Sequence, residues 1–135
     1  VHIGPVVVTD GTTCITEGAR IDGPVRVGAD AGLVVDGAAV TGPVSASRAA
    51  VVVVDDSGKV GPLTVSGTTE RLTVTGNQVT GPVRLSGNST GSEPIVIADN
   101  TIAGVLTCDG NTPAPDDAGL PNTVTGPVQG QCREL

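Results

Sequence analysis

A Gly-Pro pair that returns at nearly regular intervals is the sequence feature that most restricts how this chain folds. The pairs begin at Gly4, Gly23, Gly42, Gly61, Gly81 and Gly126, with Gly104-Val105 as the one variant. Counting that variant, successive pairs are 19 to 23 residues apart. A repeat of this length is typical of proteins built from stacked units, each resting on the one before it.

Aliphatic residues occupy fixed positions in the repeat and alternate with mostly polar ones, which indicates strands with one buried face. Ten residues after the glycine, for example, come Cys14, Leu33 and Val52. We therefore expect Cys14 to be a small buried hydrophobe. Two residues after the glycine stand Val6, Val25, Val44, Leu63, Val83, Leu106 and Val128. An antiparallel sandwich does not require one residue type at one phase of such a period, whereas a stack of coils does.

The composition agrees with short strands and frequent corners. The chain has no Phe, Trp, Tyr or Met, but it has 20 Gly and 10 Pro. Gly and Pro interrupt nearly every window in which a helix could form, and β-branched residues favour strands. The predicted fold is all-β: a right-handed parallel β-helix of six to seven coils with three short strands each. The right hand is the general preference of parallel crossovers. Residues 1–135 are expected to form a single domain, with 112–121 as a polar loop near the C-terminal end.

The net charge of −7 argues against two classes of partner. Nucleic acids and anionic membrane surfaces both require a basic face, so we expect neither as a partner. No apolar run approaches the length of a membrane span. Three cysteines in an acidic chain rich in Thr, Gly and Asn favour an exported, extracellular protein.

Regularly spaced asparagines mark the C-terminal half. Asn77, Asn100 and Asn122 are expected to share one corner column, above Ala19, Ala38 and Ser57, whereas Asn88 and Asn111 share another. Asn side chains bond to neighbouring backbone at turns, so stacked ones are predicted to hydrogen-bond along the column.

The pattern from Leu72 to Gly81, repeated from Ile95 to Gly104, resembles the right-handed parallel β-helix superfamily with the pectate-lyase-like fold. The segment from Asn100 to Cys132 is similar to the C-terminal part of uncharacterised secreted actinobacterial β-helix proteins. The resemblance implies a fold and no particular activity. Because the first coil shows no cap, the chain is expected to be the C-terminal domain of a longer exported bacterial protein.

One disulfide is predicted from the stacking. Cys108 lies in an inward column of the sixth coil and Cys132 lies near the end of the next coil, which brings them within bonding reach. Cys14 lies about five coils away, or roughly 24 Å at the spacing of adjacent strands. A Cys108–Cys132 bond would cap the C-terminal coil, which terminal repeats require.

The outward positions of the third strand are apolar where polar residues are expected. They are predicted to be Ile15, Val34, Val53, Thr73 and Val96. A sheet that is apolar on both faces is normally covered on both, and an exposed apolar stripe marks an interface. The expected partner is a second copy or a neighbouring domain of the parent chain. The alternative is that scattered surface valines are simply tolerated.

Three carboxylates, Glu17, Asp36 and Asp55, are predicted to share a column at the end of the third strand. Stacked carboxylates repel one another, and a Ca²⁺ ion could relieve the repulsion; the alternative is solvated turns without a metal. No other metal site, no cofactor and no catalytic residue is predicted. The superfamily includes polysaccharide lyases and glycoside hydrolases, whose chemistry needs clustered acids in a groove, and the sequence offers no such cluster.

Three functions follow from these observations. The leading prediction is a non-catalytic structural or interaction module that acts as a rigid spacer, stabiliser or docking and self-association surface. The first alternative is a glycan- or cell-wall-binding module that uses polar columns such as Thr73, Thr75 and Asn77. The second alternative is a degenerate polysaccharide lyase or hydrolase, which a substrate screen with and without Ca²⁺ would test.

Overall fold

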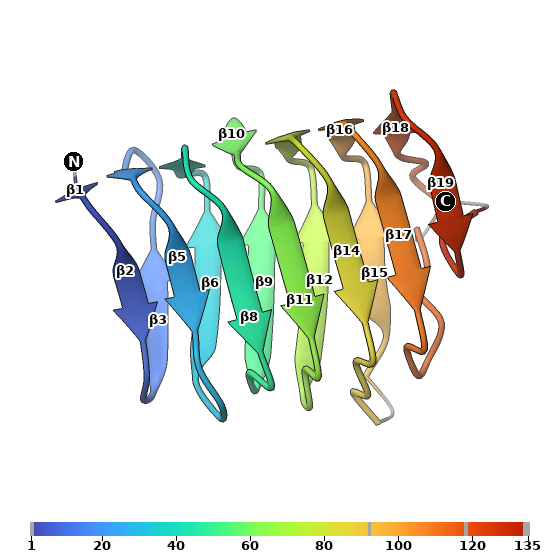
Figure 1. Cartoon of the computed structure of the whole chain (residues 1–135), viewed down its shortest axis with the longest axis horizontal. Helices are drawn as coiled ribbons and strands as arrows, with labels where there is room; N and C mark the ends of the chain where they lie inside the picture. Colours follow the sequence, from blue (N-terminus) through green and yellow to red (C-terminus); the bar gives the residue numbers. More distant parts are fainter. Residues whose placement is uncertain (1, 92, 118, 134–135) are drawn as a thin grey trace.

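The computed structural model describes residues 2–91, 93–117 and 119–133, and it winds them into a right-handed coil of strands (Figure 1). The chain descends along the near face, rises along the far face and crosses over the top into the next coil (Figure 1). It contains no helix among the described residues. The predicted parallel β-helix with three strands per coil is therefore confirmed, and its hand is the one that parallel crossovers favour.

Three parallel sheets run along the stack, which we name A, B and C in the order in which each coil enters them. Sheet A consists of β1 (His2–Ile3), β4 (Arg20–Asp22), β7 (Ala39–Val40), β10 (Lys59–Val60), β13 (Gln78–Thr80), β16 (Thr101–Ala103) and β18 (Thr123–Val124). Sheet B consists of β2 (Val6–Val8), β5 (Val25–Val27), β8 (Val44–Ser47), β11 (Leu63–Ser66), β14 (Val83–Ser86), β17 (Leu106–Asp109) and β19 (Val128–Gly130). Sheet C consists of β3 (Thr12–Ile15), β6 (Gly32–Asp36), β9 (Val51–Asp55), β12 (Arg71–Thr75) and β15 (Ile95–Ala98).

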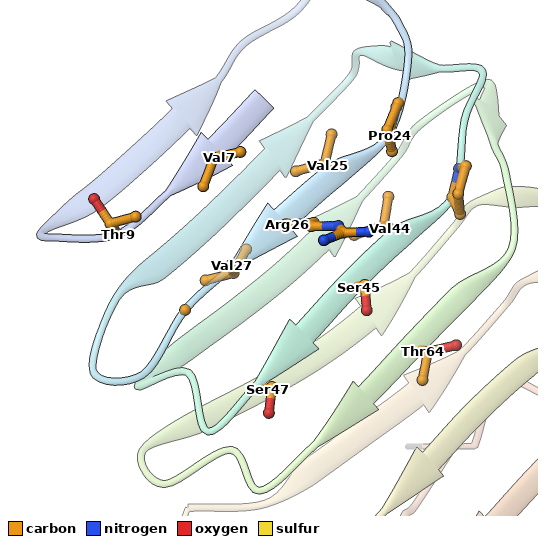
Figure 2. Close-up of a pocket in the computed structure, with 12 residues that line it drawn as sticks. Val7, Thr9, Pro24, Val25, Arg26, Val27, Val44, Ser45, Ser47 and Thr64 are labelled. Carbon is orange, nitrogen blue, oxygen red and sulfur yellow. The ribbon is translucent and has the colours of Figure 1, made fainter. Parts of the chain in front are cut away.

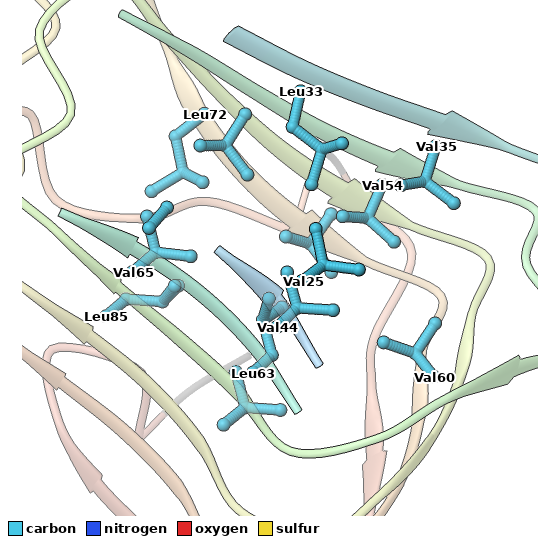
Figure 3. Packing of buried hydrophobic residues seen from close by; sticks show 14 of the residues in the cluster. Val25, Leu33, Val35, Val44, Val54, Val60, Leu63, Val65, Leu72 and Leu85 are labelled. Atoms are coloured by element: carbon cyan, nitrogen blue, oxygen red, sulfur yellow. The ribbon is translucent and has the colours of Figure 1, made fainter. Parts of the chain in front are cut away.

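Columns of Val, Leu and Ile fill the interior between the sheets. Side chains from sheet B, such as Leu63 and Leu85, point toward those of sheet C, such as Leu33 and Leu72 (Figure 3). These four side chains are fully buried, and burial of one such residue stabilises the fold by roughly 1.5–3 kcal/mol. Val60 turns inward beside Lys59 and pairs with Val40 and Val79. Aliphatic side chains therefore fill the narrow space between the three sheets, and the core needs no aromatic residue.

The glycine of the Gly-Pro pair is required because successive coils touch there. A Cβ atom at Gly104 would lie 2.6 Å from the backbone oxygen of Gly81, one coil earlier. The same overlap with the preceding coil would arise at Gly23, Gly42, Gly61 and Gly126. This contact explains why the variant pair, Gly104-Val105, keeps its glycine and changes only the proline.

The proline carbonyls complete the corner. Pro24 accepts a hydrogen bond from the backbone N–H of Val6, at 2.8 Å, and Pro43 accepts one from Val25, at 2.9 Å. Val105 accepts the equivalent bond from Val83, also at 2.8 Å. The corner therefore uses the carbonyl of this residue, so a proline, which has no N–H to donate, fits there.

The first coil departs from the predicted register, and the prediction for Cys14 is wrong. Ile15 pairs with Val35 and is buried, whereas Cys14 pairs with Val34 and is exposed. The corner before β3 is one residue shorter than the equivalent corner in the next coil, and the corner after it is one residue longer. The two changes cancel, so the spacing from Gly4 to Gly23 conceals the shift.

Two internal ladders of side-chain amides occupy the corners, as predicted. In the first, Oδ1 of Asn77 accepts from the backbone N–H of Ser57, and Asn77 and Asn100 in turn donate to the next asparagine. In the second, Asn88 donates to Oδ1 of Asn111 at 2.7 Å. That ladder ends on Gln131, whose Oε1 accepts from the Asn111 backbone at 2.8 Å; the sequence analysis did not predict this residue's role.

The C-terminal end is closed by the predicted disulfide and by part of the polar loop. Cys108 and Cys132 are bonded, with a Cα–Cα distance of 5.4 Å, and both are fully buried. Within the loop, the Asp116 backbone donates to Ile95 and accepts from Ile97, both at 2.9 Å, which adds one more rung to sheet C. Pro115 is buried, so this loop is not wholly an outward excursion.

Candidate interaction surfaces

The outer face of sheet C carries the predicted apolar row, with one correction. Val34, Val53, Thr73 and Val96 stack in register as outward residues and are each half-buried. The first member of the row is Cys14 rather than Ile15, because of the shift in the first coil. Val51, which pairs with Gly32 in the adjacent column, is also half-buried and widens the apolar surface.

The carboxylate column exists in part. Asp36 pairs with Asp55, and Asp56 joins them, with an oxygen of each carboxylate within 4.8 Å of the others. Glu17 does not belong to this group: it lies beneath Gly37, where a Cβ atom would be 3.3 Å from the Glu17 Cβ. The first-coil shift again explains the error. Three such oxygens suit Ca²⁺, and binding of that ion stays a prediction.

Of the polar column suggested for glycan binding, Thr73, Thr75 and Asn77, the asparagine is not available to a ligand. Asn77 is almost fully buried within the ladder. The Thr75 hydroxyl donates a hydrogen bond to the Asp55 carboxylate. Thr73 and Thr75 are half-buried on the outer face of sheet C, and glycan binding there stays a prediction.

Two adjoining depressions follow the outer face of sheet B. The first, of about 480 Å³, is lined by residues that include Arg26, Ser45 and Thr64. Figure 2 shows these side chains on the outside of β5, β8 and β11, with Pro24 at one end of β5. The second depression, of about 470 Å³, contains Thr64 again and continues to Arg84 and Gln129. The two depressions have Thr64 in common in their linings, and we refer to them together as the sheet B groove.

The charged side chains that line the sheet B groove are of one sign, although the exposed Asp109 lies on the same face, on the strand next to Arg84. The side chains that line it include Arg26 and Arg84 and no carboxylate. Neither guanidinium forms a hydrogen bond or ion pair with any residue that the structure describes. By contrast, Arg20 donates to Asp22 over 2.9 Å, and this hydrogen bond holds the pKa of that carboxyl below its usual range.

Sequence reasoning missed this groove, although a signal was present. Arg26 and Arg84 fall in one outward column, but two coils without a basic residue separate them, so the column reads as a solvated face. The informative sign is instead the absence of acidic residues from the groove in a chain of net charge −7.

Comparison of the chain with protein-family models, curated proteins and solved structures found no match. Within the described residues, no helix has the length and apolar character that a membrane crossing requires.

Proposed function

We propose that this chain is a non-catalytic structural and interaction module that associates through the outer face of sheet C. It acts as a rigid spacer and as a docking surface for a second copy or for a neighbouring domain of its parent chain. The observation that carries the proposal is the row of half-buried valines, Val34, Val53 and Val96, on the outside of a sheet whose inner face is also apolar.

The physical argument rests on the contrast between the sheets. Outward positions of β8 and β11 are hydroxyl residues, Ser45 and Thr64, whereas the equivalent positions of β6 and β9 are valines. Contact between valine side chains and water is unfavourable. A partner surface that covers them would stabilise the complex by roughly 25 cal/mol per Å² of apolar area removed from water. An apolar stripe on a flat sheet therefore favours association.

Two further statements belong to the same proposal. The parent protein is exported and bacterial, in line with the buried Cys108–Cys132 bond, because disulfides persist in oxidising compartments. We also propose that the fold is of the pectate-lyase-like β-helix kind and that its C-terminal part is related to secreted actinobacterial β-helix proteins. The support for this relationship is the coil architecture together with the asparagine ladders.

The deciding experiment is the solution mass, measured by light scattering after size exclusion. The variant is Val34→Lys/Val53→Lys, and the matched control is Val7→Lys, which places a lysine on a 60% exposed valine of sheet B. We expect a dimer or larger species for the wild type and the control, and a folded monomer for the double variant. A wild-type monomer at all concentrations would overturn self-association through this face.

A second candidate is a glycan- or cell-wall-binding module. The observation that favours it is the sheet B groove, whose two depressions are lined in part by hydroxyl side chains such as Ser45, Thr64 and Thr107. Binding of the chain to insoluble cell wall or polysaccharide, in a pull-down that the Val34→Lys/Val53→Lys variant leaves unchanged, would support this candidate.

A further inference from the structure

Charged side chains of opposite sign lie at the two ends of the strands of sheet C. Arg71 begins β12, whereas Asp36 and Asp55 end β6 and β9 and form, with Asp56, what we call the carboxylate cluster. We propose that two copies of this chain pack sheet C against sheet C with their stacks pointing in the same direction, so that Arg71 of each copy binds the carboxylate cluster of the other. The inference rests on the self-association proposed above and adds the arrangement of the two copies and the residues that select it.

The charged residues share the outer face of sheet C with the valine row. Side chains alternate along a strand, so Asp55 points the same way as Val53, and Arg71 points the same way as Thr73. Arg71 and Asp36 are exposed, and Asp55 is half-buried. Positive charge therefore lies at the edge of the sheet where the strands begin, and negative charge lies at the edge where they end.

Neither charge is paired within its own chain. The Arg71 side chain makes no hydrogen bond or ion pair with a described residue, although the exposed Glu70 and Glu93 line a depression beside it. The carboxylate cluster has oxygens within 4.8 Å of one another and forms no ion pair with a described cation. A guanidinium offers five N–H donors and can bind two carboxylates at once, so each group matches what the other lacks.

Covering the whole valine row requires two stacks that lie side by side. The five strands of sheet C form the far face of the stack, and the row runs across them from Val34 through Val53 to Val96 (Figure 1). A two-fold axis that brings this face onto itself lies either along the row or along the strands. The first axis leaves the two stacks pointing the same way with antiparallel strands, and the second axis does the reverse.

The charges favour the axis along the row. There, Arg71 of one copy lies over Thr75 of the other, because the two residues stand at opposite ends of β12. Thr75 pairs with Asp55, so Arg71 is one strand step, about 4.8 Å along the stack, from that carboxylate. An arginine side chain is long enough to cross the space between packed sheets, which are about 10 Å apart. With the axis along the strands, the two carboxylate clusters would instead meet at one edge and repel each other.

The free cysteine distinguishes the two arrangements. Cys14 is exposed and extends the row, since it pairs with Val34. With the axis along the row, the Cys14 side chains of the two copies face each other. With the axis along the central strand, Cys14 lies over Val96 of the other copy, four strand steps or about 19 Å from its counterpart.

The first test mixes two variants that should each fail to associate alone. In Arg71→Glu, the substituted side chain repels the carboxylate cluster of the other copy. In Asp36→Lys/Asp55→Lys, the cluster repels Arg71, although the net negative charge of the chain falls. When the two variants are mixed, opposite charges meet at both ends of the interface. Analytical ultracentrifugation gives the dissociation constant of each dimer, and circular dichroism establishes that each variant is folded.

We expect each variant to associate with itself at least about tenfold more weakly than the wild type, and the mixture to return to within about threefold of it. Arg84→Glu makes the same change of charge on sheet B, and Glu70→Gln removes the carboxylate beside Arg71. Both controls should stay within about threefold of the wild type, because neither residue faces the other copy.

The second test uses Cys14 as the probe. The wild type is treated with a bismaleimide that spans about 10 Å, the distance between packed sheets, and Cys14→Ala serves as the control. We expect a covalent dimer from the wild type and none from the control.

Three outcomes would overturn the inference. A wild-type monomer at all concentrations would remove self-association altogether and leave only docking to a neighbouring domain. A wild-type dimer that Val34→Lys/Val53→Lys dissociates, but that shows neither rescue in the mixture nor a Cys14 cross-link, would keep the proposed function and remove the arrangement. Equal weakening by Arg84→Glu and Arg71→Glu would show that overall charge, rather than the Arg71 contact, governs association.

Discussion

The side-chain nitrogen of Asn77 lies 3.0 Å from Oδ1 of Asn100 and 2.8 Å from the backbone oxygen of Val54. These three residues belong to three successive coils, so one side-chain amide links three coils. A backbone hydrogen bond between strands, by contrast, links only two. Buried polar groups must be paired, and each asparagine in the ladder pairs groups of its neighbours as well as its own.

Replacing Asn100 by Ala removes an acceptor and a donor at once. The Asn77 backbone N–H and the Val74 carbonyl lose their partner, and each unpaired buried group costs about 1–3 kcal/mol. We expect Asn100→Ala to lower the free energy of unfolding by about 3 kcal/mol, measured by urea denaturation. Thr101→Ala, at an exposed neighbouring position, is the control. A loss below about 1 kcal/mol would show that the ladder contributes little.

Thr68 offers the opposite change. Its backbone N–H donates to Asn88 at 2.8 Å, but its fully buried hydroxyl has no hydrogen-bond partner among the residues that the structure describes. Because an unpaired buried hydroxyl costs free energy, Thr68→Val, which keeps the shape, is expected to raise the free energy of unfolding by about 1 kcal/mol. The same denaturation measurement checks this prediction, and a destabilised variant would contradict it.

The contact between coils at the Gly-Pro corner predicts a sharp difference between two glycines. At Gly104 an added Cβ would overlap the Gly81 carbonyl, whereas at Gly58 nothing lies within 4 Å of it. We expect Gly104→Ala to destabilise the fold by about 1–3 kcal/mol, as overpacked sites do. Gly58→Ala should be neutral or stabilising, since it restricts the unfolded chain. Similar thermal midpoints for the two variants would exclude close stacking as the reason for the regular spacing of glycines in this sequence.

Most of the fold was predictable because the repeat reports it directly. Parallel coils place the same residue type at the same phase, so the inward columns, the ladder of Asn77 and Asn100 and the Cys108–Cys132 pair all follow from position in the period. The one register error arose in the first coil, where the corners before and after β3 change length in opposite directions. Such a pair of changes leaves the period unaltered, so the period does not reveal the shift.

The surfaces were predictable only in part. The valine row of sheet C is visible in the sequence because it breaks the alternation of apolar and polar residues. The sheet B groove is not visible in the sequence. It depends on which side chains have no hydrogen-bond partner and on the shape of the surface beside the Gly-Pro corners. Arg26 and Arg84 stand 58 positions apart in the numbering, and only the register brings them onto one strip.

The disulfide is expected to hold the last coil rather than the whole stack. Cys108 and Cys132 are 24 residues apart, and closing a loop of that size stabilises a fold by about 3 kcal/mol in the chain-entropy account. In Cys108→Ala/Cys132→Ala we expect faster amide hydrogen exchange in β18 and β19, with β8 and β11 protected as before. Uniform loss of protection along the stack would contradict a local role.

The corrected register of the first coil makes Cys14 and Ile15 behave in opposite ways. Cys14 is exposed, so its thiol should react with a maleimide in the native protein as fast as in a short peptide, to within about tenfold. Ile15 is only 7% exposed and packs in the core, so Ile15→Ala should cost about 2–4 kcal/mol, whereas Cys14→Ala should change stability by less than about 0.5 kcal/mol. The pair of variants decides between the two registers, because the uncorrected one exchanges these outcomes. A protected thiol together with a tolerant Ile15 would return Cys14 to the inward column and Ile15 to the outer face of sheet C.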